Sequence, residues 1–447
     1  MTDMADILGA PVVTLPAASM SGDVPKPVAR VAGRDLAGSR RRMTQEAATR
    51  GQTLDIVVLG GGGHVGLPLS LVLAGAGLRV GIFDTNEDTV EQITAGQMPF
   101  METGAEELLR DVLPSGRLEA SAEPSIVSRA DALVIVIGTP VDEFLAPSMT
   151  VFQRAVDQIG PYLRDGMLVV LRSTVYPGTT AFVAQALLDR GLAVDIAYCP
   201  ERIAEGHALE ELGSLPQIIG ADDDRSGDRA SALFARLGTQ VVRVSSREAE
   251  LAKLFTNTWR YMKFAVANQF FMIAHQAGVD YTNVLRAIRE DYPRAADLPG
   301  PGFAAGPCLF KDAMQLAAFT TDHFPMGQAA MQVNEGLPAY IVSALDRRYG
   351  GLRGRCIGIL GMAFKAESDD MRASLSYKLR KLLTWAGAQV LCTDPYVPDD
   401  RLVPLDQVIA ESEILILGAP HREYRALQLG GRDVVDVWNV LGGGIRL

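Results

Sequence analysis

The sequence has few cysteines and histidines, and neither type is spaced for a disulfide framework or a metal site. Its four cysteines, Cys199, Cys308, Cys356 and Cys392, stand singly without a CxxC pair, which is typical of reduced thiols in a cytoplasmic protein. The five histidines include no pair at metal-ligand spacing. We therefore expect no bound metal.

The chain also lacks a long apolar run and an excess of positive charge. No segment is apolar over the length that a bilayer requires, and residues 1–10 contain no lysine or arginine, so neither a membrane span nor a signal peptide is predicted. The formal net charge of −11 argues against nucleic acid as the main partner. These absences predict a soluble, cytoplasmic protein.

The chain of 447 residues is too long for one core. Residues 1–53 are rich in Ala, Pro, Gly and Arg without periodicity, which predicts a mobile tail; an interaction arm that uses Arg40 to Arg42 is the alternative. Strand runs alternate with helices in residues 54–246 and 346–447, and residues 247–345 contain a long helix over 247–277. The fold class is therefore α/β, with two Rossmann-like parallel-sheet domains joined by a central helical segment.

The strand runs are short, apolar and bounded by turns, as expected for buried parallel strands. In the first sheet domain they cover 55–59, 79–84, 132–137, 167–171 and 194–198, and in the second they cover 356–360, 389–394 and 414–417.

A glycine-rich run follows the first strand. Only Gly61, Gly63 and Gly66 fit the GxGxxG spacing, in which the glycines serve a tight turn, close approach of a pyrophosphate and helix–strand packing. Asp84 ends the second strand, where a carboxylate would hold a ribose 2′-hydroxyl and favour NAD over NADP. The alternative is an ordinary glycine-rich turn.

Cys308 ends a stiff Gly/Pro loop over residues 299–307 and precedes a predicted helix that contains Lys311 and Asp312. A thiol at a helix N-terminus beside a lysine is expected to titrate low and act as a nucleophile. Asp312 could accept a proton from water. A single cysteine is otherwise a small buried hydrophobe.

Eight motifs in order resemble the UDP-glucose/GDP-mannose dehydrogenase family from about Leu54 to the C-terminus. They are GGGHVGLP (61–68), GTPVDE (138–143), STVYPGTT (173–180), CPERIAEG (199–206), ELAKLFTN (250–257), GPGFAAGPCLFKD (300–312), GMAFKAESDDMRAS (361–374) and TDPY (393–396).

The resemblance implies a two-step, NAD-dependent oxidation of the sugar C6 alcohol of a nucleotide sugar to a uronate. Cys308 would form a thiohemiacetal and then a thioester, which water activated by Asp312 would hydrolyse. Lys253 and Asn257 would stabilise oxyanions, with Thr174 and Glu201 in the same pocket. The alternative for Lys253 is an i,i+3 ion pair with Glu250, and a role for Glu205 is left open.

The resemblance also implies which residues bind the ligands. NAD would contact Gly61, Gly63, His64, Val65, Gly66, Asp84, Thr139 and Thr174. The nucleotide sugar would contact Glu201, Lys253, Asn257, Arg294, Gly302, Gly306, Lys365 and Arg372. In this set the amides of the Gly300–Gly306 loop would face the sugar and its phosphate, and Arg294 would reach the site of the neighbouring subunit. The long helix would form the core of a homodimer.

The chain departs from the family pattern at His64, where an aromatic is common, and at Ala304-Ala305 before the cysteine. The CPER form of the motif at Glu201 and the PGPG run are similar to the N-acetyl branch, so UDP-N-acetylmannosamine is the expected substrate and UDP-glucose the alternative. The product would be a uronate for polysaccharide synthesis. A single-step β-hydroxyacid dehydrogenase and a non-catalytic sensor of NAD or a sugar nucleotide remain the other hypotheses.

Overall fold

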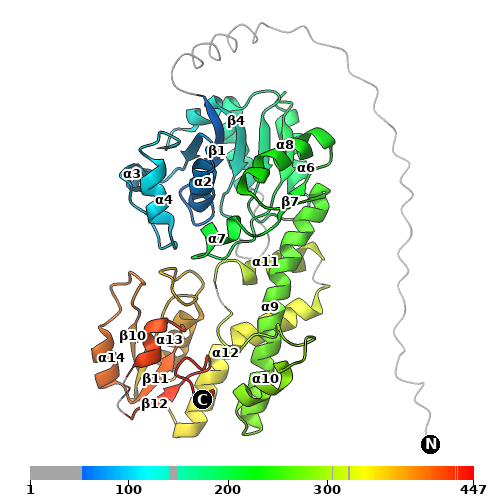
Figure 1. Cartoon of the computed structure of the whole chain (residues 1–447). Helices are drawn as coiled ribbons and strands as arrows, with labels where there is room; N and C mark the ends of the chain where they lie inside the picture. Colours follow the sequence, from blue (N-terminus) through cyan, green and yellow to red (C-terminus); the bar gives the residue numbers. More distant parts are fainter. Residues whose placement is uncertain (1–52, 140–149, 305, 321–322, 428, 430) are drawn as a thin grey trace, which may run out of the picture. The chain divides into compact units, whose positions relative to one another are not determined.

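The computed structural model describes residues 53–139, 150–304, 306–320, 323–427, 429 and 431–447. The predicted mobile tail lies outside these residues except for Thr53, and so do residues 140–143 of the GTPVDE motif. Figure 1 shows the described part of the chain and labels many of its helices and strands.

The first sheet has eight strands in the order β3-β2-β1-β4-β5-β6-β7-β8. The strands are β1 (Leu54–Leu59), β2 (Val80–Phe83), β3 (Leu118–Ser121), β4 (Ala130–Ile135), β5 (Leu168–Leu171), β6 (Asp195–Tyr198), β7 (Gln217–Gly220) and β8 (Val241–Val244). The pairings from β3 to β6 are parallel, whereas β6 and β7 meet antiparallel at Tyr198 and Gly220. The five strands predicted here are confirmed, and β3, β7 and β8 were not predicted.

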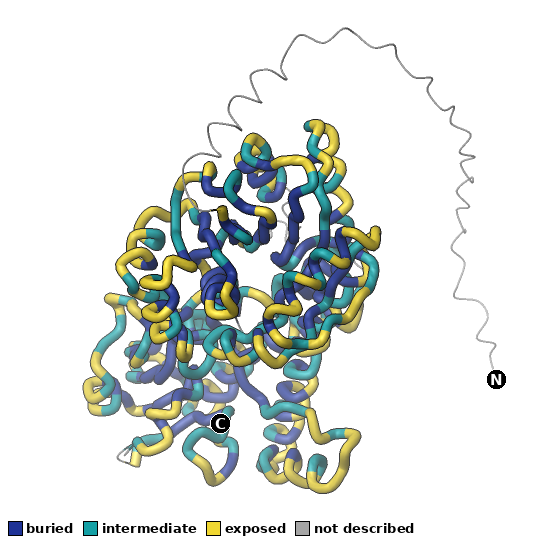
Figure 2. The backbone as a smooth tube through the Cα atoms, turned by 45° about the horizontal axis from the view of Figure 1, so that its top comes forward, coloured by how far each residue is buried: buried dark blue, intermediate teal, exposed yellow. Residues whose placement is uncertain are grey.

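Helices cover both faces of this sheet because successive residues of a strand point to opposite sides. Ile56 and Val58 of β1 pack into one core with α2, whereas Val57 and Leu59 pack into another with α5. The central strands β1, β2, β4 and β5 are almost entirely buried, and Figure 2 draws buried residues in dark blue. The helices of this region are α2 (Gly66–Gly75), α3 (Glu87–Thr94), α4 (Ala105–Val112), α5 (Thr150–Ile159), α6 (Thr179–Leu188), α7 (Ala208–Leu212) and α8 (Asp224–Phe234), with short 3₁₀ turns η1 (Pro124–Arg129), η2 (Gly160–Tyr162) and η3 (Ala235–Leu237).

Four helices follow, of which α9 (Ser246–Gln276) is the longest in the described part of the chain. Its N-terminus is closed by a capping box, in which Ser245 Oγ accepts from Glu248 N and Glu248 Oε2 accepts from Ser245 N, and no glycine or proline interrupts it. The helix predicted over 247–277 is therefore confirmed. The others are α10 (Tyr281–Arg289), α11 (Leu309–Phe319) and α12 (Pro325–Tyr349).

The second sheet has four parallel strands in the order β10-β9-β11-β12. They are β9 (Cys356–Leu360), β10 (Gln389–Thr393), β11 (Ile414–Leu417) and β12 (Asp433–Val435), accompanied by α13 (Leu375–Trp385), α14 (Leu405–Glu411) and η4 (Arg422–Ala426). The predicted α/β class with two Rossmann-like sheets is confirmed.

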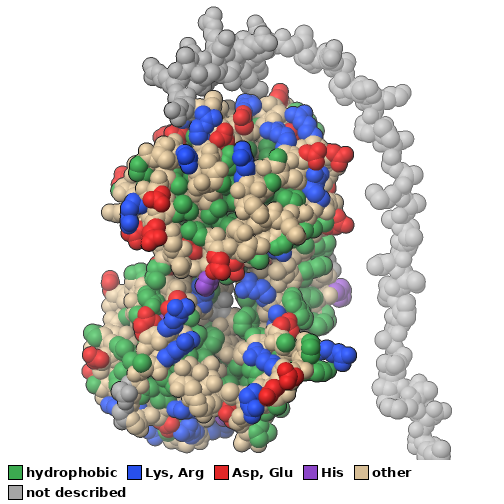
Figure 3. Space-filling model, viewed as in Figure 1, with side chains coloured by type: hydrophobic (Ala, Val, Ile, Leu, Met, Phe, Trp, Pro, Cys, Tyr) green, Lys and Arg blue, Asp and Glu red, His purple; other side chains and the backbone are tan. Residues whose placement is uncertain are grey.

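Acidic and basic side chains are interspersed over the face drawn in Figure 3. None of the helices described is both long and apolar enough to cross a membrane.

Candidate active site

The glycine run lies at the carboxyl end of β1 and leads into α2. Gly60 has a φ of +75°, and a Cβ there would lie 1.9 Å from the carbonyl oxygen of Val136. A Cβ on Gly66 would lie 2.3 Å from the carbonyl oxygen of Gly60, as expected for close helix–strand packing. The tight turn that we predicted at Gly61 is therefore made at Gly60, because this residue has the left-handed backbone.

Gly63 differs from its neighbours because the protein does not fill the space beside it. A Cβ on Gly63 would meet no atom closer than 3.7 Å. No described residue lies close enough to require glycine here, whereas the pyrophosphate of a dinucleotide would require it. Val65 is the N-cap residue of α2, and the helix N-terminus favours an anion at this place.

Asp84 follows β2 and is bound to the same turn. Its Oδ2 accepts a hydrogen bond from Gly62 N at 2.9 Å, and its Oδ1 accepts one from Asn86 N at 3.1 Å. Because a carboxylate can accept about four hydrogen bonds, this partly exposed residue retains acceptor capacity for ribose hydroxyls. The turn, the open side of Gly63 and Asp84 together fit NAD.

His64 projects from the glycine run and stacks on Phe100, with the ring centroids 4.0 Å apart. Burial lowers the pKa of His64, and the Arg372 guanidinium lowers it further. His64, in the predicted cofactor loop, is therefore within electrostatic range of Arg372 in the predicted substrate loop.

Cys308 is exposed and forms the N-cap of α11, as the sequence predicted. Its predicted low titration is wrong. Desolvation by the surrounding protein raises the pKa of the Cys308 thiol, and the Asp312 carboxylate adds to this rise against the opposing effects of Lys311 and Lys253. The thiol therefore needs a proton acceptor before it can attack a carbonyl carbon.

Asp312 is fully buried one turn after Cys308. Its Oδ2 accepts a hydrogen bond from Asn257 Nδ2 at 2.5 Å, and its Oδ1 lies 3.6 Å from Lys311 Nζ. Oδ1 has no hydrogen-bond partner among the described residues. Because a buried acceptor without a partner is costly, this oxygen is suited to bind a water or a substrate group.

Lys253 is 7% exposed, and burial lowers its pKa while Asp312, Cys308 and Glu201 oppose the shift. The alternative ion pair with Glu250 does not form in the described part of the chain. Glu250 instead accepts hydrogen bonds from Gly178 N at 2.6 Å and from Thr180 N at 2.8 Å, so it caps α6. Lys253 instead interacts electrostatically with the Asp312 carboxylate and the Cys308 thiol.

The two threonines of the site link three elements. Thr139 Oγ1 donates to Thr174 O at 2.7 Å and accepts from Lys311 Nζ at 3.0 Å. These bonds hold the ends of β4 and β5 against the first turn of α11.

Glu201 has little acceptor capacity left. Its carboxylate binds the buried Arg172 through Nε at 3.0 Å and through Nη2, and Oε1 also accepts from Arg202 N at 2.7 Å and Ile203 N at 3.0 Å. Four hydrogen bonds saturate a carboxylate. The geometry therefore gives Glu201 a role in holding the loop after β6.

Glu205, which sequence reasoning left open, has the more distinctive environment. Burial raises its pKa to about 7, and the Asp370 carboxylate adds to the rise against Arg372 and Lys365. Arg372 Nη2 lies 3.2 Å from Glu205 Oε1, and Lys365 Nζ donates to the Glu205 carbonyl oxygen. The predicted diphosphate residues Lys365 and Arg372 therefore meet at Glu205, and no local sequence signal could reveal this contact between distant segments.

The loop glycines do not present their amides as predicted. Gly302 N donates to Asn268 Oδ1 at 2.8 Å, Gly306 N lies 3.4 Å from Ala373 O, and both glycines are buried. Each has a positive φ, and an added Cβ would lie 2.2 Å from the Trp438 ring at Gly302 and 2.6 Å from the Phe364 ring at Gly306. The glycines are needed instead for backbone shape and for packing against these rings.

Arg294 is exposed in the described chain, and its guanidinium lies 5.9 Å from the centroid of the Tyr292 ring. It belongs to no cluster with Cys308 or Lys253 among the contacts described above.

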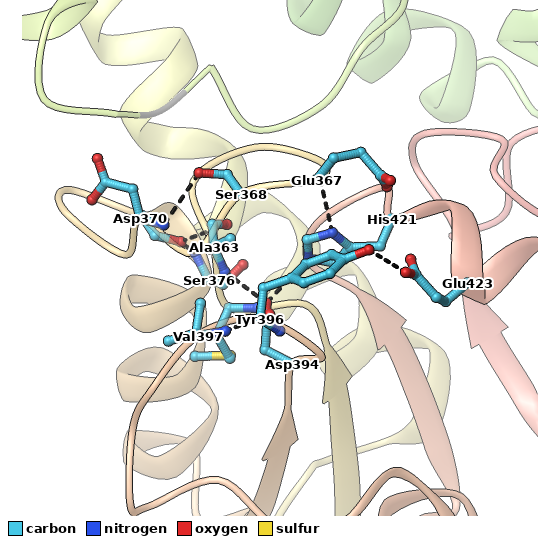
Figure 4. Close-up of polar contacts among 12 residues, drawn as sticks. Ala363, Glu367, Ser368, Asp370, Ser376, Asp394, Tyr396, Val397, His421 and Glu423 are labelled. Atoms are coloured by element: carbon cyan, nitrogen blue, oxygen red, sulfur yellow. Dashed lines mark hydrogen bonds and ion pairs between the residues drawn. The ribbon is translucent and has the colours of Figure 1, made fainter. Parts of the chain in front are cut away.

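The loop that carries Lys365 and Arg372 is held by a buried network, drawn in Figure 4. The side chain of Asp394 is 0% exposed, and its Oδ2 accepts from Met362 N at 2.6 Å and Ala363 N at 2.9 Å. His421 Nε2 lies 3.1 Å from the same oxygen, and His421 Nδ1 accepts from Glu367 N at 3.0 Å. His421 therefore donates to Asp394 and anchors the loop at Glu367.

The glycine run generates a paired prediction. Gly60→Ala should lower the free energy of unfolding by about 1–3 kcal/mol or more, because it strains the backbone and overlaps Val136. Gly63→Ala should leave the melting temperature unchanged but weaken NAD binding by about tenfold or more, because its Cβ meets the described residues only at an ordinary contact distance of 3.7 Å and would occupy the space proposed for the pyrophosphate. Thermal unfolding and calorimetric titration with NAD measure both, and wild-type NAD affinity in Gly63→Ala would contradict this reading.

Glu205 generates a prediction on pH. The pKa of Glu205 in the folded state is about 7, which exceeds the ordinary value for a glutamate. The stability that depends on its protonated form is therefore fully present below about pH 4.5 and is lost as the pH rises through 7. Glu205→Gln stays neutral, so its melting temperature relative to wild type should rise between pH 5 and pH 8. Glu106→Gln, at a surface pair with Arg110, is the control. A difference for Glu205→Gln that is constant with pH would refute the prediction.

The comparisons with known proteins cover most of the chain. Residues 54–238, 247–336 and 358–443 match the NAD binding domain, the central domain and the UDP binding domain of the UDP-glucose/GDP-mannose dehydrogenase family. The UDP-N-acetyl-D-mannosamine dehydrogenase of Methanocaldococcus jannaschii is 30% identical over 398 residues, which cover 85% of this chain and 91% of that protein. The enzyme of the same name from Escherichia coli K12 is 28% identical, over 84% and 95%.

Solved structures agree with these matches. A UDP-glucose dehydrogenase from the archaeon Pyrobaculum islandicum has a TM-score of 0.81 at 32% identity, covering 86% of this chain and 94% of that chain. A UDP-N-acetyl-D-mannosamine dehydrogenase from Pyrococcus horikoshii has a TM-score of 0.81 at 26% identity, covering 87% and 96%. The resemblance seen in the sequence is confirmed: the chain belongs to the UDP-glucose/GDP-mannose dehydrogenase family of nucleotide-sugar dehydrogenases.

Proposed function

We propose that this chain oxidises C6 of a UDP-N-acetylhexosamine twice, to the uronate, with Cys308 carrying the carbon as a thioester. The observation that carries the proposal is that the exposed residue Cys308 interacts electrostatically with the buried Lys253 and with the buried Asp312, whose Oδ1 has no hydrogen-bond partner among the described residues. A family member with a single oxidation would have no use for this thiol.

Bound NAD would accept a hydride in each of the two oxidations, one NAD per step. The residues that fit it are Gly63, the N-terminus of α2 and Asp84, whose negative charge would repel a 2′-phosphate and so favours NAD over NADP. His64, Thr139 and Thr174 remain predicted cofactor contacts.

Side chains of this chain carry out the covalent and proton-transfer steps at the sugar carbon. The Cys308 thiolate adds to the C6 aldehyde to form a thiohemiacetal, and oxidation of that carbon gives the thioester. Lys253 and the Asn257 amide stabilise the oxyanion of each tetrahedral form. A water attacks the thioester carbon, Asp312 Oδ1 takes one of its protons, and the C–S bond breaks to release the thiolate and the carboxylic acid, which loses its remaining proton to solvent.

Glu205 is the residue we propose as proton acceptor for the Cys308 thiol. Its pKa of about 7 suits proton exchange at neutral pH, and its charge contributes to the raised pKa of the Cys308 thiol. Glu201 then acts by positioning, because Arg172 and two backbone amides occupy its carboxylate.

UDP-N-acetylmannosamine is our first candidate substrate because the curated relatives named above carry that name. UDP-glucose is the second because the Pyrobaculum islandicum structure, at 32% identity, is described as a UDP-glucose dehydrogenase. In either case Lys365 and Arg372 would bind the diphosphate. We place the reaction in the cytoplasm, and the domain division 54–246, 247–345 and 346–447 stays a prediction.

The test is turnover of each UDP-sugar with NAD. We expect two NADH per uronate with UDP-N-acetylmannosamine, and a quenched intact mass that shows the UDP-sugar acyl group on Cys308. Cys308→Ser should lose uronate formation by about 100-fold or more while remaining folded. One NADH per substrate, or full activity of Cys308→Ser, would refute the thioester route and favour a single-step dehydrogenase. Binding without any turnover would favour a sensor, and turnover of UDP-glucose alone would reassign the sugar.

We also propose that the active form is a homodimer built on α9. Phe255, Trp259, Val266, Phe270 and Ile273 are exposed apolar side chains at helical spacings of three, four and seven residues. A stripe of this kind on a long helix is typical of a helix–helix interface. Arg294, exposed near the C-terminal end of α10, would then reach the substrate of the partner.

The dimer generates its own prediction. Trp259, which is 58% exposed, lies on the stripe, so Trp259→Glu should shift the molar mass from that of a dimer to that of one chain. Trp385→Glu on α13 is the matched control, since Trp385 is 88% exposed but lies away from α9. Light scattering after size exclusion measures both, and a dimer unaffected by Trp259→Glu would exclude α9 as its core.

A further inference from the structure

Two asparagines of α9 contact the catalytic segment on either side of Cys308. Asn257 Nδ2 donates to Asp312, four residues after the cysteine, and Asn268 binds Gly302, six residues before it. The asparagines are eleven residues apart on the helix, which is about three turns, so their side chains leave α9 on the same face.

The contact at Gly302 uses every polar group of the asparagine side chain. Asn268 Oδ1 accepts from Gly302 N at 2.8 Å, and Asn268 Nδ2 donates to Gly302 O at 3.0 Å. The second hydrogen of Nδ2 is directed to Asn334 Oδ1 on α12 at 2.9 Å, and Asn334 Nδ2 donates to Tyr261 O at 3.0 Å. Asn268 and Asn334 are each 0% exposed. Loss of any of these hydrogen-bond partners would therefore leave a buried polar group unpaired.

The opposite side of Gly302 is closed by Trp438, whose ring would overlap a Cβ at 2.2 Å. Trp438 Nε1 is itself fixed by a hydrogen bond to Leu417 O at the end of β11. The hydrogen bonds to Asn268 and the packing against Trp438 therefore together restrict movement of Gly302 relative to α9.

We infer that Asn268 is a positioning residue that, together with Asn257, fixes Gly302 and Asp312, the contact points on either side of Cys308, in register with α9. Lys253 lies on the same helix, so this register sets where the Cys308 thiol lies relative to the lysine. The role acts on thiol geometry rather than on the fold as a whole. It rests on the proposed function of Cys308, which the Cys308→Ser experiment tests separately.

The experiment compares Asn268→Ala and Asn334→Ala with Tyr340→Phe. Tyr340 also joins α12 to α9, through His275 Nδ1 at 2.7 Å and Met272 O at 3.2 Å, but it does not contact the cysteine loop. Tyr340→Phe therefore removes a polar contact between the same two helices without releasing Gly302.

Three quantities are measured for each full-length variant: the melting temperature, kcat and KM with the active UDP-sugar, and the rate at which iodoacetamide labels Cys308 between pH 6 and pH 9.5, read on the Cys308 peptide by mass spectrometry. Asn268→Ala should lower kcat by about 100-fold with a much smaller change in KM, and its labelling profile should shift in midpoint. Asn334→Ala keeps the Asn268–Gly302 pair, so its effect should have the same direction and a smaller size, and it carries the test if Asn268→Ala does not fold.

Tyr340→Phe should lower the melting temperature while kcat and the labelling profile stay as in wild type. The inference is overturned if the asparagine variants show a wild-type labelling profile and kcat, or if Tyr340→Phe changes both quantities as much as they do. If Cys308→Ser were active, the proposed catalytic function of Cys308 would be wrong. The labelling profile of Cys308 would then be the measurement that tests whether Asn268 positions the thiol.

Discussion

The buried hydrogen bond between Asn257 Nδ2 and Asp312 Oδ2, at 2.5 Å, constrains the rest of the site. It joins α9 to α11 at the point where the chain has just passed Cys308, and Oδ1 of the same carboxylate has no hydrogen-bond partner among the described residues. Because α9 is one uninterrupted helix, the residues it carries cannot move independently. Glu250 caps α6, Lys253 interacts electrostatically with the Cys308 thiol and Asn268 holds Gly302, all at fixed rotations about one axis.

Continuous apolar runs made the parallel strands readable from the sequence, since strands buried on both faces have few polar positions. β8 was missed because only the terminal valines of Val241–Val244 are even half-buried and Arg243 interrupts the run. The motif residues Cys308, Lys253, Asp312 and Asn257 were also found in the sequence. Their electrostatics were not, because the pKa of Cys308 depends on Asp312, Lys253 and Glu205, which come from three different segments. The sequence also did not show that Glu250 binds Gly178 and Thr180 rather than Lys253, because these two residues lie some seventy residues earlier in the chain.

Each sheet has an aspartate directly after its second strand in the chain, Asp84 after β2 and Asp394 after β10. The two carboxylates differ in burial and in hydrogen bonding. Asp84 binds its turn through one backbone amide and remains partly exposed. Asp394 accepts from two amides of the corresponding turn and is closed over by His421, so its carboxylate has no contact with solvent. Only the first sheet therefore offers a carboxylate to a ribose, and the second offers the cations of the loop that His421 anchors. One backbone plan thus yields two kinds of nucleotide site through the burial of a single side chain.

The pair formed by Arg172 and Glu201 also affects how this sequence can drift over generations. The side chains are 0% and 8% exposed, and removing one partner of such a pair leaves an uncompensated charge at a cost of about 3–5 kcal/mol, a large part of the stability of an ordinary domain. Either single replacement would therefore remove much of the stability of the folded chain. The two codons are expected to persist together or to change together.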